Sequence, residues 1–138
     1  MDSYVELYKG GIIPLEQFNN MKKDNDILVR IIVKKVPCKV TYTAMRAQRT
    51  DFPVLACAVS CVNGEYRAAV GARPARAQIY RDDSKLVNGT VTGENAKAFA
   101  AFVAQNAPTE SNIRGSAAYR THLIRVLVMR CMQELGGI

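Results

Sequence analysis

The hydrophobic pattern divides the chain into a β-rich first part and a helical second part. Residues 27–35 read ILVRIIVKK and are rich in β-branched side chains, so they predict a strand that ends before Pro37. Residues 53–62 are apolar at almost every position, which is typical of a strand covered on both faces. The first part of the chain therefore predicts a sheet that another layer must cover.

A hairpin signal follows the second of these strands. Asn63-Gly64 is the dipeptide most typical of a two-residue hairpin turn, and residues 66–72 supply the returning strand. Residues 75–81 predict a further extended segment. Between residues 41 and 50, Tyr42 and its neighbours show helical spacing, so a short helix or helical turn is predicted there.

Two longer helices are predicted in the second part. Thr92 is a suitable N-cap for a helix through residues 95–105, and Ser116 for a helix over residues 117–135. In the last helix, Tyr119 and Leu123 share the apolar stripe, and we expect both to face the sheet.

Strands followed by helices predict an α+β fold. We expect an antiparallel sheet of three to four strands with about three helices packed on one face. Residues 1–25 are expected to form a linker, and residues 26–138 a single domain. With 138 residues, 49% of them hydrophobic, the chain is long enough for one core.

Neither the apolar stretches nor the N-terminus predicts a membrane or secretory location. The stretches near residues 27–33 and 54–62 are much shorter than the ~20 residues of a membrane helix. The first residues, MDSYVELYKGG, lack the basic and apolar regions of a signal peptide. We therefore expect a cytoplasmic protein.

The four cysteines predict reduced thiols rather than disulfides or a metal site. Cys57 and Cys61 fall in a predicted strand, where free cysteine behaves as a small hydrophobic residue. Cys38 and Cys131 occur singly, without a paired motif or nearby histidine. We expect no zinc or iron–sulfur site within this chain.

The residues that could carry catalysis are few. His122 is the only histidine, and its place in an apolar helix predicts a packed or hydrogen-bonded side chain. Asp82 and Asp83 are adjacent, so in an extended segment they point in opposite directions. No glycine-rich phosphate-binding motif follows a strand. We expect no catalysis by this chain alone.

The positive charge is clustered. The formal net charge is +7, from 19 Lys and Arg against 12 Asp and Glu. Residues 67–81 and residues 114–130 each contain four arginines and no acidic residue. Such clusters suit a basic binding or regulatory module for nucleic acid or an acidic protein. Because aromatic residues are not interleaved with them, a docking face for other domains or subunits fits better.

Two stretches of sequence resemble a known family. Residues 114–128 read RGSAAYRTHLIRVLV, and within residues 49–76 DFPVLACAVSCV precedes a hairpin and VGARPAR. Together they resemble the C-terminal domain of the FAD-binding (medium) subunit of molybdenum hydroxylases, the xanthine dehydrogenase and carbon monoxide dehydrogenase group. The resemblance covers about residues 26–135, and residues 8–28 are similar to the linker that precedes this domain.

The resemblance implies a part in an oxidoreductase. The parent enzyme would pass electrons from a molybdenum centre through iron–sulfur clusters to FAD and then to an acceptor such as NAD. FAD would belong to the parent subunit and would not bind this chain alone. The molybdenum cofactor and the clusters would lie on partner subunits. The expected partners are the FAD-binding domain and the molybdenum and iron–sulfur subunits of the same complex.

The resemblance also points to candidate flavin contacts. In the family, the segment before the DF strand approaches the flavin, and some relatives carry a lysine near its start; the corresponding residue here is Thr43. Arg46, Arg49 and Asp51 are the best candidates for flavin-side or interdomain contacts. The alternative for them is a helix start capped by charge pairs.

Overall fold

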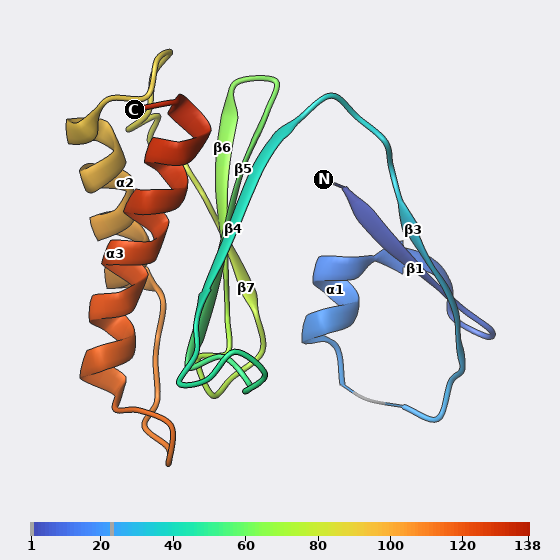
Figure 1. Cartoon of the computed structure of the whole chain (residues 1–138). Coiled ribbons are helices and arrows are strands. Elements are labelled where there is room, and N and C mark those ends of the chain that lie inside the picture. Colours follow the sequence, from blue (N-terminus) through green and yellow to red (C-terminus); the bar gives the residue numbers. More distant parts are fainter. Residues whose placement is uncertain (1, 23) are drawn as a thin grey trace. The chain divides into compact units, whose positions relative to one another are not determined.

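The computed structural model describes residues 2–22 and 24–138, which divide into two compact units, Met1–Pro37 and Cys38–Ile138. Figure 1 shows the chain with its elements labelled. The predicted domain boundary at residue 26 differs from this division. Residues 26–37 belong to the first compact unit, together with most of the segment that was expected to be a linker.

The first unit is a small antiparallel sheet with one short helix. Its strand order is β2-β1-β3. The strand predicted over residues 27–35 is confirmed as β3. The elements are β1 (Ser3–Leu7), β2 (Gly11–Pro14), α1 (Leu15–Asn20) and β3 (Leu28–Val33).

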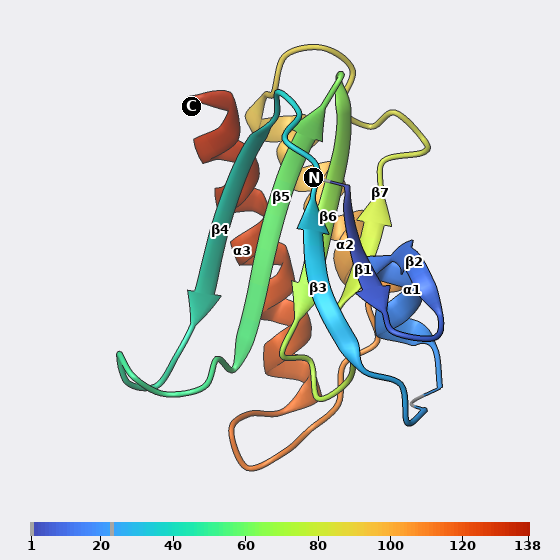
Figure 2. The ribbon, with the colours of Figure 1, turned by 90° about the vertical axis from the view of Figure 1, so that its right-hand side faces the viewer.

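The second unit is a four-stranded antiparallel sheet in the order β4-β5-β6-β7, with two helices on one face (Figure 1). Figure 2 shows α3 running behind β4 and β5, and α3 packs against both strands. The predicted α+β class is confirmed. The elements are β4 (Lys39–Met45), β5 (Leu55–Val62), β6 (Glu65–Gly71), β7 (Gln78–Arg81), α2 (Gly93–Asn106) and α3 (Ala117–Gly136).

The local signals for turns and caps hold. Asn63 and Gly64 have φ of 51° and 81°, the left-handed backbone that a tight hairpin requires, and Val62 pairs with Glu65. The Thr92 side chain caps α2, and that of Ser116 accepts a hydrogen bond from the Tyr119 N–H at the start of α3.

The helix or helical turn predicted over residues 41–50 is wrong, because most of this segment forms β4. Thr43 pairs with Cys57, and Met45 pairs with Leu55. Directly opposed residues share a face, so Thr43 and Met45 lie on the side of the sheet that the helices cover. The β-branched threonines alternate with outward residues such as Tyr42, a two-residue period that outweighed the helical spacing.

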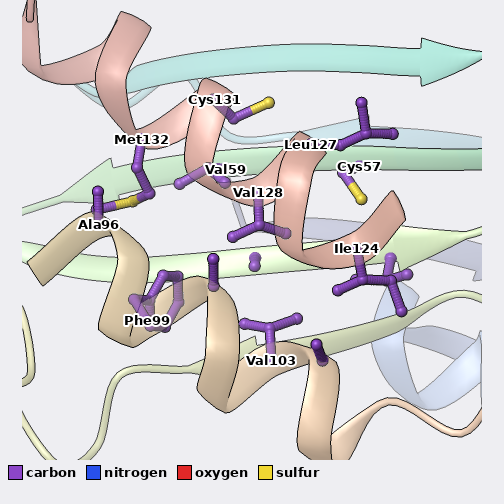
Figure 3. Packing of buried hydrophobic residues seen from close by; sticks show 14 of the residues in the cluster. Cys57, Val59, Ala96, Phe99, Val103, Ile124, Leu127, Val128, Cys131 and Met132 are labelled. Carbon is purple, nitrogen blue, oxygen red and sulfur yellow. The ribbon is translucent and has the colours of Figure 1, made fainter. Parts of the chain in front are cut away.

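The core of the second unit lies between the sheet and its two helices. Leu55, Cys57 and Val59 of β5 are at most 1% exposed and pack with buried residues of α2 and α3. Figure 3 shows Phe99 of α2 and Val128 of α3 within this cluster. Sheet and helices thus bury one contiguous apolar layer.

The prediction for α3 is confirmed for Leu123, which is 4% exposed, but it is wrong for Tyr119, which is 43% exposed. Tyr119 lies in the first turn, close to Gly115 of the preceding loop. Of the two alternatives for His122, packed or hydrogen-bonded, the packed one is also wrong. His122 is exposed like Arg125, because both lie on the helix face opposite the stripe of Leu123.

All four cysteines are free. Burial raises the pKa of the Cys57 thiol to about 12, with a smaller contribution from Cys131. Burial also raises the pKa of Cys131. The two thiols buried in the core are therefore protonated near neutral pH.

None of the helices in the part of the chain that the structure describes combines the length and the apolar character needed to span a membrane.

Candidate functional site

Three of the four predicted site residues lie in the loop between β4 and β5. The Val54 N–H donates to the Met45 carbonyl at 2.8 Å and closes this loop. Inside it, Arg46 Nη1 donates to the Asp51 carbonyl oxygen at 2.6 Å. The Asp51 carboxylate accepts the Phe52 N–H at 2.7 Å. These bonds make the loop a defined turn, and no helix begins in it, so the alternative of a capped helix start is wrong.

The structure separates Thr43 from this loop. Thr43 lies within β4 and is half-buried on the side that the helices cover, whereas Arg46 and Arg49 are exposed and Asp51 is half-buried. The two arginines and Asp51 thus occupy an open surface. They can offer guanidinium groups to an anion or a carbonyl oxygen, but they do not enclose a ligand.

A second loop, between α2 and α3, lies against the first. Its backbone is held by paired bonds between Asn112 and Gly115, each N–H donating to the other's carbonyl at 3.1 Å. The Ala117 N–H donates to Ser111 Oγ at 2.9 Å. The Arg114 guanidinium lies 5.4 Å from the centre of the Phe52 ring, a cation–π contact between the two loops.

The buried side chain of Arg120 in α3 donates hydrogen bonds to both loops. Its side chain donates through Nε to the Val54 carbonyl at 3.0 Å. Through Nη1 it reaches the carbonyls of Glu110 at 2.6 Å and Gly115 at 2.5 Å, and through Nη2 it reaches Asn112 Oδ1 at 2.6 Å. Arg120 is 1% exposed, and these four acceptors are all neutral oxygens. Its role is to fix the two loops against each other.

Several residues of the motif at positions 114–120 have a structural role. At Gly115, an added Cβ would lie 3.1 Å from Val54 Cγ1, so a larger residue would push the loops apart. Ser116 caps α3, Arg114 makes the cation–π contact with Phe52, and Arg120 bonds to Val54. The two stretches that carry the family resemblance therefore meet in one place.

We call the exposed part of this junction the loop surface; it comprises Arg46, Arg49, Phe52, Ile113 and Arg114. Phe52 is 73% exposed and Ile113 is 98% exposed, although both side chains are large and apolar. Three arginines accompany them. Sequence reasoning identified Arg46 and Arg49 but missed Phe52, Ile113 and Arg114. The available signal was Arg120, the arginine of the GSAxYR motif, which marks the start of this helix as unusual.

Arg73 performs a similar task at the turn after β6. It is 5% exposed, and its Nε donates to the Arg76 carbonyl at 3.0 Å. Its Nη1 donates to the Pro108 carbonyl at 2.7 Å, which joins this turn to the segment that follows α2. The arginine in VGARPAR is therefore a buried structural residue, and the basic clusters of the sequence are only partly a surface property.

Comparison with known proteins places the second unit in context. The model of the CO dehydrogenase flavoprotein C-terminal domain matches residues 40–135, which is more than half of the chain. The search among curated proteins gave no significant match.

Solved structures share the fold. Quinoline 2-oxidoreductase from Pseudomonas putida 86 aligns with a TM-score of 0.84 and 17% identity, over 99% of this chain and 53% of its own. A carbon monoxide dehydrogenase from Hydrogenophaga pseudoflava, which lacks the Mo-pyranopterin moiety of its molybdenum cofactor, aligns with a TM-score of 0.74 and 19% identity, over 96% and 52%. A cyanide-inactivated Cu,Mo-CO dehydrogenase aligns with a TM-score of 0.72 and 19% identity, over 99% and 53%. The chain thus spans about half the length of these chains.

Proposed function

Because the chain belongs to the family of CO dehydrogenase flavoprotein C-terminal domains, we propose that it forms part of the FAD-binding subunit of a molybdenum hydroxylase. Its second unit would pack on the FAD-binding domain and on partner subunits. As in a xanthine dehydrogenase-like enzyme, electrons would pass from molybdenum through iron–sulfur clusters to FAD. The proposal also includes a cytoplasmic location. This chain would support that transfer without performing catalysis alone.

The observation that carries the proposal is the match over residues 40–135, together with the junction that its two motif stretches form. Arg120 and Gly115 hold two loops in contact, and this rigid base presents Phe52 and Ile113 to solvent. Exposed apolar side chains on a fixed loop are typical of a surface that another protein covers. The loop surface is therefore the proposed interdomain contact.

FAD would meet this chain at one side only. When bound, FAD supplies the acceptor for the electrons. The exposed guanidinium groups of Arg46 and Arg49 suit a phosphate or a flavin carbonyl, whereas Thr43, on the helix-covered side of β4, is less accessible. We propose that Arg46, Arg49 and Asp51 contribute flavin-side or interdomain contacts, and that other polypeptide supplies the remaining walls of the site.

Purification of the tagged chain from its native cell tests this proposal. The expected eluate contains FAD, measured by its absorbance and fluorescence, together with molybdenum and iron, measured by mass spectrometry. A chain that elutes free of flavin and of both metals would contradict the proposal. If it instead carried nucleic acid that salt releases steeply, the alternative of a basic binding module would be supported.

Titration of the isolated chain with FAD tests the narrower statement about the flavin. Because the residues facing it lie on an open surface, we expect no binding tighter than roughly millimolar. Micromolar binding with a protein-bound flavin spectrum would show that this chain contains the site.

A further inference from the structure

The outer strand of the first unit exposes an unusual run of apolar side chains. Four residues of β3 are exposed to between 44% and 59%: Leu28, Val29, Ile31 and Val33. β3 is also an edge strand, because the order β2-β1-β3 leaves one of its sides unpaired among the described strands. An exposed, apolar edge strand is a template for pairing with another chain, and soluble proteins normally cover it.

The first unit has little else to hold it together. Among its described residues, only Val5 and Leu7 of β1 are buried. The helix α1 packs against β1 and β2 but contains no buried residue. A unit of this size rarely buries enough apolar surface to be stable alone. This unit is therefore incomplete as it stands.

The side chains of β3 show where the missing cover belongs. Ile31 pairs with Val5, and Val33 pairs with Ser3, so Ile31 and Val33 share a face with the buried Val5. Val5 is fully buried, whereas Ile31 is 59% exposed and Val33 is 49% exposed. The apolar face thus continues onto β3 without a covering layer.

The solved chains extend beyond the part that this chain matches. They match 99%, 96% and 99% of this chain, the first unit included, yet this match accounts for only 52–53% of their own chains. We propose that the free edge of β3 and its Ile31–Val33 face bind polypeptide equivalent to the rest of those chains, which on the proposed function is the FAD-binding part. The inference rests on that function and adds a location: backbone hydrogen bonds at the edge and apolar contacts at Ile31 and Val33.

The test uses the tagged chain purified from its native cell, with bound flavin per chain as the readout. Ile31→Asp and Val33→Asp place a charge on the proposed contact, and we expect each to lower the flavin content by about tenfold or more. Leu86→Asp is the matched control, because Leu86 is 38% exposed and lies outside β3. It should leave the flavin content unchanged. Unaltered helical circular dichroism would show that the second unit remains folded.

The outcomes separate this inference from the proposed function. If the unmodified chain carries flavin and both β3 variants retain it, the β3 contact is refuted while the proposed function stands. If the variants instead break only an association between two copies of this chain, the occupant is a second copy and the inference is refuted. If the unmodified chain carries no flavin, both fail.

Discussion

The two units differ in how much of their apolar surface they bury. The second unit buries a contiguous layer between its sheet and two helices, and two buried arginines fix its loops from inside. In the first unit, only two of the described side chains are buried, and the apolar residues of β3 face solvent. Sheets of three and four strands can thus differ in stability, because burial of the apolar face under another layer stabilises a sheet.

Replacing Arg120 should have the largest effect on this comparison. Arg120→Met leaves the carbonyls of Val54, Glu110 and Gly115 without their buried donor, and we expect a loss of about 3 kcal/mol or more in the free energy of unfolding. Urea unfolding followed by circular dichroism measures it. Arg125→Met, at an exposed position of the same helix, should change stability by less than about 0.5 kcal/mol. Equal effects of the two substitutions would show that the buried bonds contribute nothing.

A leucine pair compares the two units directly. Leu123→Ala removes a side chain that is 4% exposed from the core of the second unit, and should cost about 2 to 5 kcal/mol. Leu28→Ala in β3, where the leucine is 44% exposed, should cost less than about 0.5 kcal/mol in the isolated chain. Comparable losses in urea unfolding would mean that β3 is covered as well as α3.

The buried Cys57 predicts that stability falls at high pH. Its pKa is raised to about 12 in the folded state, so the folded chain holds the thiol proton more tightly than the unfolded chain does. This contribution is complete below the ordinary thiol pKa of 9.0 and is lost between pH 9 and 12, by about 1 kcal/mol per pH unit. Cys57→Ala should make the free energy of unfolding fall less steeply over this range. An unchanged slope would refute the prediction.

Asp26 predicts a smaller effect, confined to the first unit. Its carboxylate accepts the N–H groups of Lys9, Gly10 and Ile27. Although desolvation acts in the opposite direction, these bonds hold the pKa of Asp26 below its ordinary value. The stability that they contribute is present above pH 3.8 and is lost as the pH falls through the lowered value. Asp26→Asn should speed amide exchange at Lys9 and Gly10 and leave α3 unchanged; exchange that accelerates equally in both units would contradict this.

Local signals in the sequence predicted most of the second unit. The hairpin at Asn63-Gly64 and the caps Thr92 and Ser116 depend on neighbouring residues alone, so they could be recognised without the fold. The strand β4 was predicted as a helix or helical turn, because the helical spacing around Tyr42 competed with the two-residue alternation of its threonines. The helix layer that these threonines face lies far away in the sequence. Residues 1–25 were expected to form a linker, since the short strands β1 and β2 within them gain their order by pairing with each other and with β3.

The candidate flavin contacts remain a prediction. Arg46, Arg49 and Asp51 were identified through the family resemblance, and the structure brings the three into one loop. Phe52 and the neighbouring residues Ile113 and Arg114 were missed, because the two loops meet only in the folded chain, where Arg120 bonds to acceptors up to 66 residues away. A buried arginine that bonds to backbone carbonyls leaves no pattern of charge pairs in the sequence.

Hydrogen exchange measured on the isolated chain and on the flavin-containing assembly tests the central claim most directly. We predict that the amides of β3 exchange orders of magnitude faster than those of α3 in the isolated chain, and become strongly protected in the assembly. The amides of α3 should be protected in both. Protection of β3 equal to that of α3 in the isolated chain, or no gain in the assembly, would contradict the account of a first unit completed by the flavin-binding polypeptide.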